Sequence, residues 1–136
     1  MAAARTKGPR ASATRRERYT EKRMATLPNS DKAVVDPAKL TAYCLNPDHP
    51  HGGPKARVFR AFLGLTAEHA DLLRDALVNA ARIEEAEERL EDAYGKRYEV
   101  RFALRGPNGN TAEVTSAWIV DTGENFPRLT SAYIKI

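Results

Sequence analysis

The feature that most constrains the fold of this chain is a change in hydrophobic period near position 94. Before that point, apolar residues recur at the spacing of one helix face: Ala70, Leu73, Leu77 and Ala81. After it, apolar residues alternate with charged ones: Tyr98, Val100, Phe102 and Leu104. The first spacing predicts an amphipathic helix, and the second predicts a half-buried strand. Helices followed by antiparallel strands predict an α+β fold.

Two turns divide the later part of the chain into strands. Residues 106–110 (GPNGN) predict a hairpin turn, because Asn-Gly tolerates positive φ at both positions. This turn joins the alternating strand to a return strand over 111–121. A second turn at 122–125 leads to a final strand over 128–136. These segments together predict an antiparallel meander.

Three helices are predicted ahead of the strands, over residues 37–43, over 55–63 and from residue 66 onward. Asp36 is a good N-cap for the first helix, and Thr66 caps the third. Gly64 suits the position just after the second helix. The second helix is expected to turn three apolar side chains inward: Val58, Phe59 and Phe62.

Residues 83–93 (IEEAEERLEDA) are ambiguous. Their composition favours helix, with five glutamates on a solvated face. They fit either a continuation of the third helix or an edge strand that begins near Leu90.

The net charge of +4 is unevenly distributed along the 136 residues. Residues 1–35 hold nine Lys/Arg and three Asp/Glu, whereas residues 36–136 hold thirteen and fifteen. The first segment also lacks a sustained apolar face, so we expect a disordered basic extension over 1–35 and a single α+β domain over 36–136. A basic extension either anchors a polyanion such as nucleic acid or is simply a solvated terminus, and both interpretations stand.

The sequence predicts a cytoplasmic protein with no membrane partner. No apolar run approaches the length of about 18 residues that a membrane span needs. No apolar segment follows the basic start, so no secretory signal is predicted. The single cysteine, Cys44, cannot form an internal disulfide, which fits a reducing compartment. We expect Cys44 to be a half-buried apolar residue.

The loop at 44–56 (CLNPDHPHGGPKA) concentrates the residues suited to chemistry. The imidazole of His49 is a side chain that can accept and donate a proton at neutral pH, and Lys55 lies close to a predicted helix N-terminus, where N–H groups favour an anion. Phosphodiester cleavage needs such an acid or base and such a cation. The same residues also fit a plain turn, in which His49 and Asp48 stabilise the loop and Lys55 is solvated.

No cofactor or metal is predicted. The phosphate-binding, dinucleotide-binding and zinc motifs are absent from the sequence. Asp48, His49 and His51 are too few, within one loop, to predict a metal site. Trp118 in the middle of a strand fits the core better than a ligand platform, and Arg97 faces either phosphates or water.

Six short motifs occur in order along the chain. They are LNPDHPHGGPKARVF (45–59), GLT (64–66), YGKRY (94–98), GPNG (106–109), WI (118–119) and PRLTSAY (127–133). Together they resemble a small bacterial domain family of unassigned function, which occurs alone and at the C-termini of polymorphic and contact-dependent inhibition toxins. The resemblance spans about residues 37–134.

The resemblance implies the architecture shared by barnase, EndoU and RelE-type ribonuclease toxins. In it, N-terminal helices pack on a four-stranded antiparallel sheet, which favours a strand at the end of 83–93. Such enzymes cut RNA without metal, by attack of the 2′-hydroxyl and formation of a cyclic phosphate.

Matching motif positions give the expected site residues. The catalytic set is His49, Lys55, Arg128 and Ser131, and the substrate-binding set is Arg97, Thr130, His51 and Trp118. His49 is the expected general acid or base, and Ser131 stands where the family has a threonine.

Two functions therefore remain open. The first is a metal-independent ribonuclease of the toxin type, which acts on RNA, has a cognate immunity or antitoxin protein, and works in the cytoplasm or is delivered into that of a target cell. The second is a non-catalytic module that docks nucleic acid or a partner protein through its basic N-terminal segment.

Overall fold

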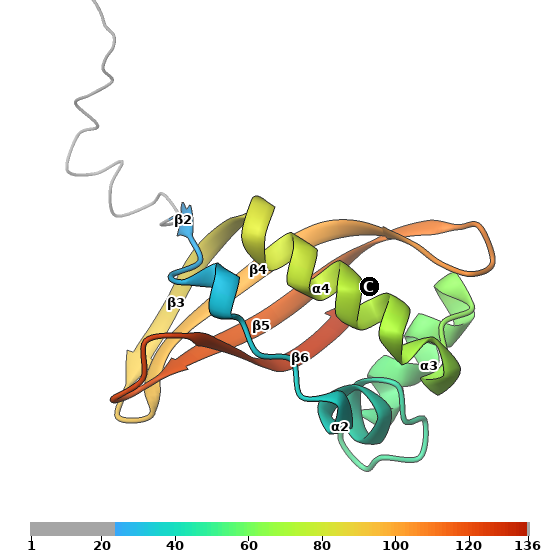
Figure 1. The fold of residues 1–136 in the computed structure, drawn as a ribbon. Helices are drawn as coiled ribbons and strands as arrows, with labels where there is room; N and C mark the ends of the chain where they lie inside the picture. The colour runs from blue at the N-terminus through green and yellow to red at the C-terminus, as the bar shows by residue number, and fades with distance from the viewer. Residues whose placement is uncertain (1–23, 136) are drawn as a thin grey trace, which may run out of the picture.

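The computed structural model describes residues 24–135, which form an antiparallel five-stranded sheet with helices on one face and at one end (Figure 1). The α+β class is thereby confirmed. The elements in chain order are β2 (Met24–Thr26), the 3-10 helix η1 (Ser30–Lys32), α2 (Pro37–Lys39), the π-helical turn η2 (Leu40–Cys44), α3 (Gly53–Leu63), the 3-10 helix η3 (Ala67–His69), α4 (Ala70–Ile83), β3 (Glu85–Asp92), β4 (Gly95–Arg105), β5 (Thr111–Asp121) and β6 (Pro127–Ile134).

The strands lie in the sheet in the order β2-β3-β4-β5-β6, each antiparallel to its neighbour. β3 to β6 are the four strands of the predicted meander. β2 adds a fifth strand, so the expected count of four was one short. β4 and β5 pair along their full lengths, from Gly95 opposite Asp121 to Arg105 opposite Thr111.

Residues 24–35 take part in the fold, although the sequence analysis placed them in the basic extension. β2 pairs with β3, and the side chains of Leu27 and Val35 are buried in the core. Val34 also forms a parallel bridge to Arg128 on β6. The rest of the predicted extension, residues 1–23, lies outside the described residues.

The ambiguous segment 83–93 is resolved in favour of a strand. α4 ends at Ile83, and β3 begins at Glu85, five residues before the position suggested by the sequence. The early start is explained by pairing with β4, since Ala86 lies opposite Val100 and is fully buried.

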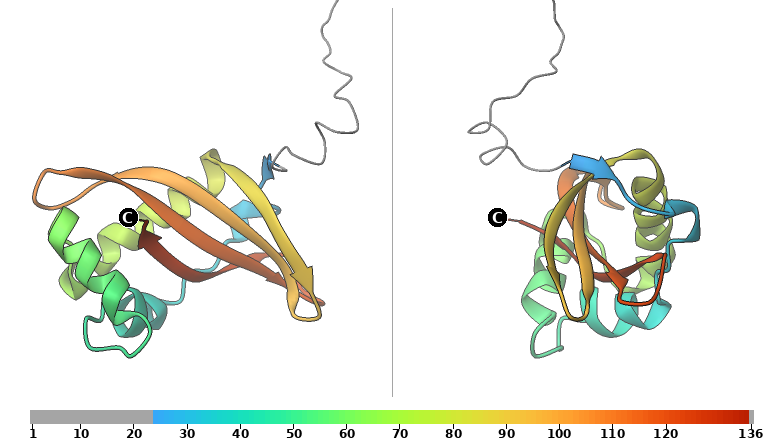
Figure 2. Two further views of the ribbon diagram at one scale, coloured as in Figure 1. Left: turned by 180° about the vertical axis from the view of Figure 1, so that it is seen from behind. Right: turned by 90° about the vertical axis from the view of Figure 1, so that its left-hand side faces the viewer.

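The helices divide between one face and one end of the sheet. In Figure 1, α4 lies across a face of the strands, while α2 and α3 gather at one end. The buried side of α4 carries the residues that the sequence predicted, Leu73, Leu77 and Ala81. Seen from behind in Figure 2, β3, β4 and β5 lie in front of α4, so that α4 does not cover this second face. We call it the open face.

α3 buries Phe59 and partly buries Val58, as predicted, but the rest of its inward set differs. Its inward side chains are Ala56, Phe59 and Leu63, at helical spacing. Phe62 was expected inside, but it is 46% exposed, because Leu63 occupies the inward position of that turn. Gly64 ends the helix with a φ of 68°, as expected for a glycine at that position.

The β4–β5 hairpin turn holds the C-terminal end of α3. The Asn108 backbone N–H donates to the Leu63 carbonyl at 3.2 Å. The Asn108 and Asn110 side-chain amides donate to the Phe62 carbonyl at 3.2 and 3.3 Å. A helix end leaves its last carbonyls without intrahelical partners, and these bonds satisfy two of them. The direction of α3, and with it the position of Lys55, is therefore fixed by the hairpin.

No helix within residues 24–135 has the length and apolar character required to cross a bilayer.

Candidate functional site

The β5–β6 pair contains a bulge that turns two hydroxyl groups to the open face. Ala117 lies opposite Ser131 and Trp118 lies opposite Leu129, so Thr130 is an extra residue in β6. Leu129 and Ala132 are both buried, and the two residues between them are both half-exposed. In a regular strand Thr130 and Ser131 would point to opposite faces. β-Bulges re-aim side chains in this way and are frequent beside functional sites.

Lys55 reaches this bulge from the first turn of α3. Its Nζ donates to Ser131 Oγ at 3.3 Å, across 76 positions of sequence. Two tyrosine rings surround the ammonium group, with centroids 4.8 Å (Tyr133) and 5.8 Å (Tyr43) from Nζ. The first turn of a helix carries partial positive charge, so the ammonium and the helix end favour an anion at the same place.

His49 lies next to Tyr43. The two rings meet edge to face with centroids 4.8 Å apart. His49 Nδ1 accepts the backbone N–H groups of His51, at 3.0 Å, and Gly52, at 2.9 Å. Because Nδ1 is an acceptor, the neutral ring carries its proton on Nε2, which is then a hydrogen-bond donor.

The loop around His49 is held against the helices by close backbone contacts. A Cβ at Gly52 would overlap the Tyr43 carbonyl oxygen, so only glycine lets the chain approach there. The Arg57 side chain donates to the Pro47 carbonyl at 2.6 Å. These contacts fix His49 relative to Tyr43 and α3.

The structure brings two of the four expected catalytic residues, Lys55 and Ser131, into direct contact, and a third, His49, contacts the same Tyr43 ring that Lys55 lies over. The fourth, Arg128, forms a bidentate ion pair with Asp121, with N–O distances of 2.9–3.0 Å. Arg128 lies three residues before Ser131 on β6, and its guanidinium is already neutralised by a carboxylate.

The expected substrate-binding residues are more scattered. Arg97 is on the open face of β4 and pairs with Asp92 at 3.5 Å. Thr130 lies in the bulge, where its hydroxyl donates to the Ala117 carbonyl at 3.1 Å. His51 is exposed in the loop, with its ring 6.0 Å from that of His49.

Trp118 belongs to the core. Its side chain is 1% exposed, and its Nε1 donates to Ser116 Oγ at 2.9 Å. Cys44 is also fully buried, rather than half-buried as expected, and burial raises the pKa of its thiol. A buried, protonated thiol is a poor nucleophile.

The two tyrosines beside Lys55, Tyr43 and Tyr133, are not among the residues that the sequence predicts for the site. Tyr133 shares the period-two alternation of Ser131 along β6, and this spacing is the sequence signal that places it on the same face.

A hollow of about 280 Å³ opens on the open face beside the bulge. Its floor and walls include two of the expected substrate-binding residues, Arg97 and Thr130, together with Glu99 and Ala117. Trp118 also contributes to its lining, although its side chain is almost wholly buried.

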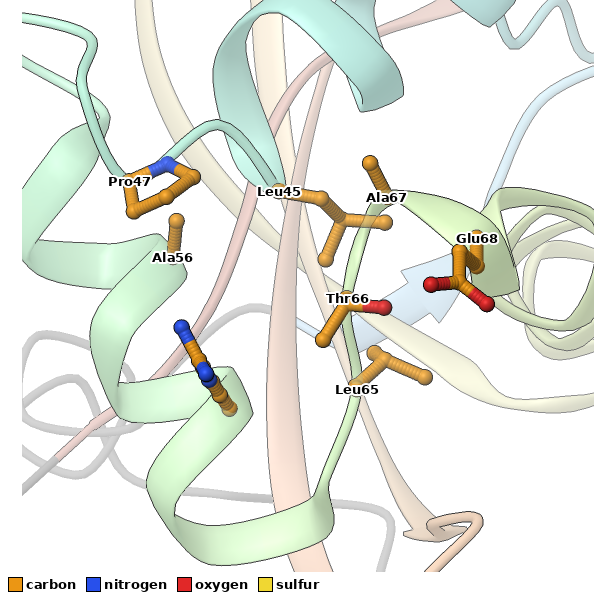
Figure 3. A pocket seen from close by; sticks show the side chains of 8 residues that line it. Leu45, Pro47, Ala56, Leu65, Thr66, Ala67 and Glu68 are labelled. Atoms are coloured by element: carbon orange, nitrogen blue, oxygen red, sulfur yellow. The ribbon is translucent and has the colours of Figure 1, made fainter.

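A second hollow, of about 210 Å³, lies between α3 and the start of η3 (Figure 3). Its lining is mostly apolar, with Leu45, Ala56 and Leu65 among its residues. The described residues that line it include none of the predicted site residues.

Metal-ligating side chains do not gather anywhere in the described part of the chain. Within residues 24–135, no three side chains of His, Cys, Asp or Glu lie close enough together to hold an ion. Asp48 is exposed in its turn.

The fold is similar to that of a chain in a solved complex. The structure matches a chain of the "Contact-dependent growth inhibition toxin - immunity protein complex from Klebsiella pneumoniae 342" with a TM-score of 0.58 and 18% sequence identity. The match covers 79% of this chain and 97% of that chain. At this identity the likeness concerns the fold.

No curated protein matches the sequence significantly. A family model described as a domain of unknown function (DUF6883) matches residues 26–136. That range includes β2 from its last residue, all the helices of the described part, and the whole candidate site. The chain therefore belongs to the DUF6883 family of domains.

Proposed function

We propose that this domain is a toxin-type ribonuclease whose site is the group formed by His49, Lys55 and Ser131. The observation that carries the proposal is the contact between Lys55 Nζ and Ser131 Oγ at a bulge on the open face. The fold likeness to a chain of a toxin–immunity protein complex supports the toxin class. The open face of β3, β4 and β5 is accessible to an extended single strand, because α4 lies on the opposite side of the sheet.

The reaction is an intramolecular transesterification, in which the 2′-hydroxyl attacks the adjacent phosphodiester. The 2′-hydroxyl oxygen forms a bond to phosphorus, and the bond from phosphorus to the 5′-oxygen breaks. The 2′ proton passes to solvent water, and the leaving 5′-oxygen takes a proton from water. The products are a 2′,3′-cyclic phosphate and a 5′-hydroxyl end. Negative charge develops on the phosphorus oxygens, where a fixed cation and hydrogen-bond donors stabilise it most.

Lys55 and Ser131 supply that stabilisation in the proposal. The ammonium faces the non-bridging oxygens, and the Ser131 hydroxyl donates a hydrogen bond to them. Because Lys55 is half-buried between Tyr43 and Tyr133, its charge is less screened than that of an exposed lysine.

The role of His49 differs from the one expected from the sequence. With Nδ1 accepting two N–H groups, the neutral ring offers Nε2–H as a donor and has no free acceptor nitrogen. We therefore assign His49 the binding of a phosphate oxygen through Nε2–H, rather than removal of the 2′ proton.

The test compares cleavage of an end-labelled single-stranded RNA by the full chain, in the presence of EDTA, with cleavage by two variants. Lys55→Met removes the charge and keeps the length of the side chain. We expect it to lower kcat/KM by about 10²–10³, the usual cost of losing one group that stabilises the transition state. Lys32→Met is the matched control, because it removes an equal charge from the exposed η1 and should leave the rate unchanged.

The cyclic phosphate end is the second readout of this experiment. RNA that stays intact with the wild-type chain would refute the proposal, and so would cleavage by Lys55→Met at the wild-type rate.

Three sets of side-chain contacts favour the second candidate, a non-catalytic binding module. His49 Nδ1 is engaged within its own loop, and Arg97 and Arg128 are paired with Asp92 and Asp121. Such internal contacts keep a binding surface rigid. They also occupy side chains that a catalytic mechanism would require to be unpaired. Under this alternative, a variant that lacks the basic residues 1–23 loses binding, whereas His49→Ala keeps it.

A toxin-type activity implies a cognate immunity or antitoxin protein and a site of action in the cytoplasm of the producing or the targeted cell. We propose that such a partner covers the Lys55–Ser131 contact. Its binding surface would then carry acidic side chains opposite Lys55.

A further inference from the structure

We propose that the hollow beside the bulge is a nucleobase subsite that selects guanine. This inference rests on the proposed function, because it assigns to that same site the base next to the reacting phosphate. The hollow is about 280 Å³, at the small end of ligand pockets, and this size suits a single base.

The hollow directly adjoins the catalytic group. Ala117 on β5 lies opposite both Glu99 on β4 and Ser131 on β6. The methyl side chain of Ala117 leaves space between these two longer side chains, and Thr130 closes the side next to Ser131. A nucleotide with its phosphate at Lys55 and Ser131 therefore has its base within reach of the hollow.

The walls suit a flat aromatic ring. Two guanidinium groups line the hollow, and each is held by a carboxylate: Arg97 by Asp92 at 3.5 Å, and Arg89 by Glu87 at 3.0 Å. Guanidinium planes stack on the unpaired bases of single-stranded RNA, and such bases are read through hydrogen bonds to their edges.

Glu99 supplies the selectivity. Its Oε1 accepts from Arg101 Nη2 at 3.4 Å, while Oε2 forms an ion pair with Arg89 Nε at 4.0 Å, a separation too long for a hydrogen bond. An ionised carboxylate only accepts hydrogen bonds. Among the RNA bases, guanine presents two adjacent N–H donors on its Watson–Crick edge, at N1 and N2. Adenine and cytosine present a donor beside an acceptor, and uracil a donor between two acceptors, so a carboxylate repels part of each edge.

The test is calorimetric titration of the full chain with the four nucleoside 3′-monophosphates and with ribose 5-phosphate. We expect guanosine 3′-monophosphate to bind at least about tenfold more tightly than the other probes, a difference typical of one well-formed recognition contact. Ala117→Met fills the hollow and should abolish this preference. Ala103→Met is the matched control, because it places the same side chain on the open face of β4, opposite Glu113 and outside the hollow.

Glu99→Gln is the second variant, and it keeps the size of the side chain. Its amide adds a donor, so we expect the guanine preference to fall while binding of ribose 5-phosphate is unchanged. The inference is overturned if Ala117→Met, folded as judged by circular dichroism, binds guanosine 3′-monophosphate like the wild type. It is also overturned if all four nucleotides bind no better than ribose 5-phosphate.

The two proposals fail in different ways. Guanine binding that depends on Ala117, without cleavage of RNA, would refute the ribonuclease and leave the base subsite standing. Cleavage of RNA with no base preference and no effect of Ala117→Met would refute the subsite and leave the ribonuclease standing.

Discussion

A single carboxylate organises the turn between β3 and β4. Asp92 Oδ1 accepts the backbone N–H groups of Tyr94, at 2.9 Å, and Gly95, at 3.3 Å. Its other oxygen pairs with Arg97. The bond from the Tyr94 N–H, helped by the Arg97 charge, lowers the pKa of Asp92. The same carboxylate thus shapes the turn and orients an arginine that lines the hollow beside the bulge.

Replacing Asp92 should give a stability loss that depends on pH. Because its pKa is lower in the folded protein than in the unfolded chain, the carboxylate stabilises the fold above its ordinary pKa of about 4. That contribution disappears as the pH falls through the folded-state pKa. We expect Asp92→Ala to lower the midpoint of thermal unfolding at pH 7 and to have a smaller effect at pH 3. Glu91→Gln, the neighbouring exposed carboxylate, serves as control. If Asp92→Ala lowers the midpoint of thermal unfolding equally at both pH values, the ionised carboxylate of Asp92 does not stabilise the fold as proposed.

At the scale of elements, the packing contact between the β4–β5 hairpin and α3 determines the position of Lys55. Gly106 packs so closely that an added Cβ would overlap both the Leu63 carbonyl oxygen and the Leu63 Cβ. Neither atom is the mobile end of a long side chain, so α3 or the hairpin would have to shift.

The corresponding prediction compares two glycines in turns. Gly106→Ala should destabilise the fold by about 1–3 kcal/mol, the usual cost of overpacking, and should displace α3. Gly123→Ala is the control, because Gly123 has a φ of 88° and no atom within 4 Å of an added Cβ. It should cost only the strain of its backbone conformation, about 1–2 kcal/mol, and leave cleavage unchanged. Denaturant unfolding measures the stabilities. If Gly106→Ala keeps the stability and the cleavage rate of the wild type, the close contact between the hairpin and α3 is not needed to position Lys55.

A helix or strand can be predicted from the sequence when its hydrophobic pattern and its turn residues lie within or next to the element itself. The helix at α4 and the strands β4 and β5 show strong periodicity, and their turns carry Asn-Gly and Thr-Gly pairs. β2 has three residues, Met-Ala-Thr, and no alternation long enough to detect, so its pairing with β3 depends on tertiary contacts. The start of β3 at Glu85 is likewise decided by pairing with β4 rather than by its glutamate-rich composition.

The site is less predictable than the fold, because the bulge cannot be recognised from the sequence of β6 without its pairing to β5. Thr130 and Ser131 share a face only because Thr130 is an extra residue between Leu129, opposite Trp118, and Ser131, opposite Ala117. The tautomer of His49 depends on two N–H groups of its own loop, which no residue pattern reveals. Lys55 and Ser131 were expected at the site through their motif positions, and their contact required the sheet to be complete.

At the scale of the whole molecule, the excess positive charge and the candidate site lie in different parts of the chain. Residues 1–23 hold eight Lys/Arg and two Asp/Glu, whereas residues 24–136 hold fourteen and sixteen. The part that carries the candidate site is therefore slightly acidic, and RNA binding by this part alone would rely on local cations such as Lys55. The basic segment would add affinity without sequence information.

Two truncations separate the contributions of the N-terminal region. Removing residues 1–35 deletes β2 and the buried Leu27, whose loss alone should cost about 2–5 kcal/mol. Removing residues 1–23 leaves these contacts in place. We expect the shorter deletion to unfold at a higher temperature than the longer one, and to bind RNA with a weaker dependence on salt than the full chain. Equal melting temperatures of the two truncations would contradict the role of β2.

The two ends of the Lys55–Ser131 contact lie 76 positions apart, and the chain between them builds α3, α4 and three further strands before β6 is added. Such a contact has a high contact order, so it cannot form early from a local segment. It appears only in molecules that have completed the sheet, and partly folded chains lack it. Loss of the site in denaturant should therefore coincide with cooperative global unfolding, which makes activity a direct measure of the folded fraction.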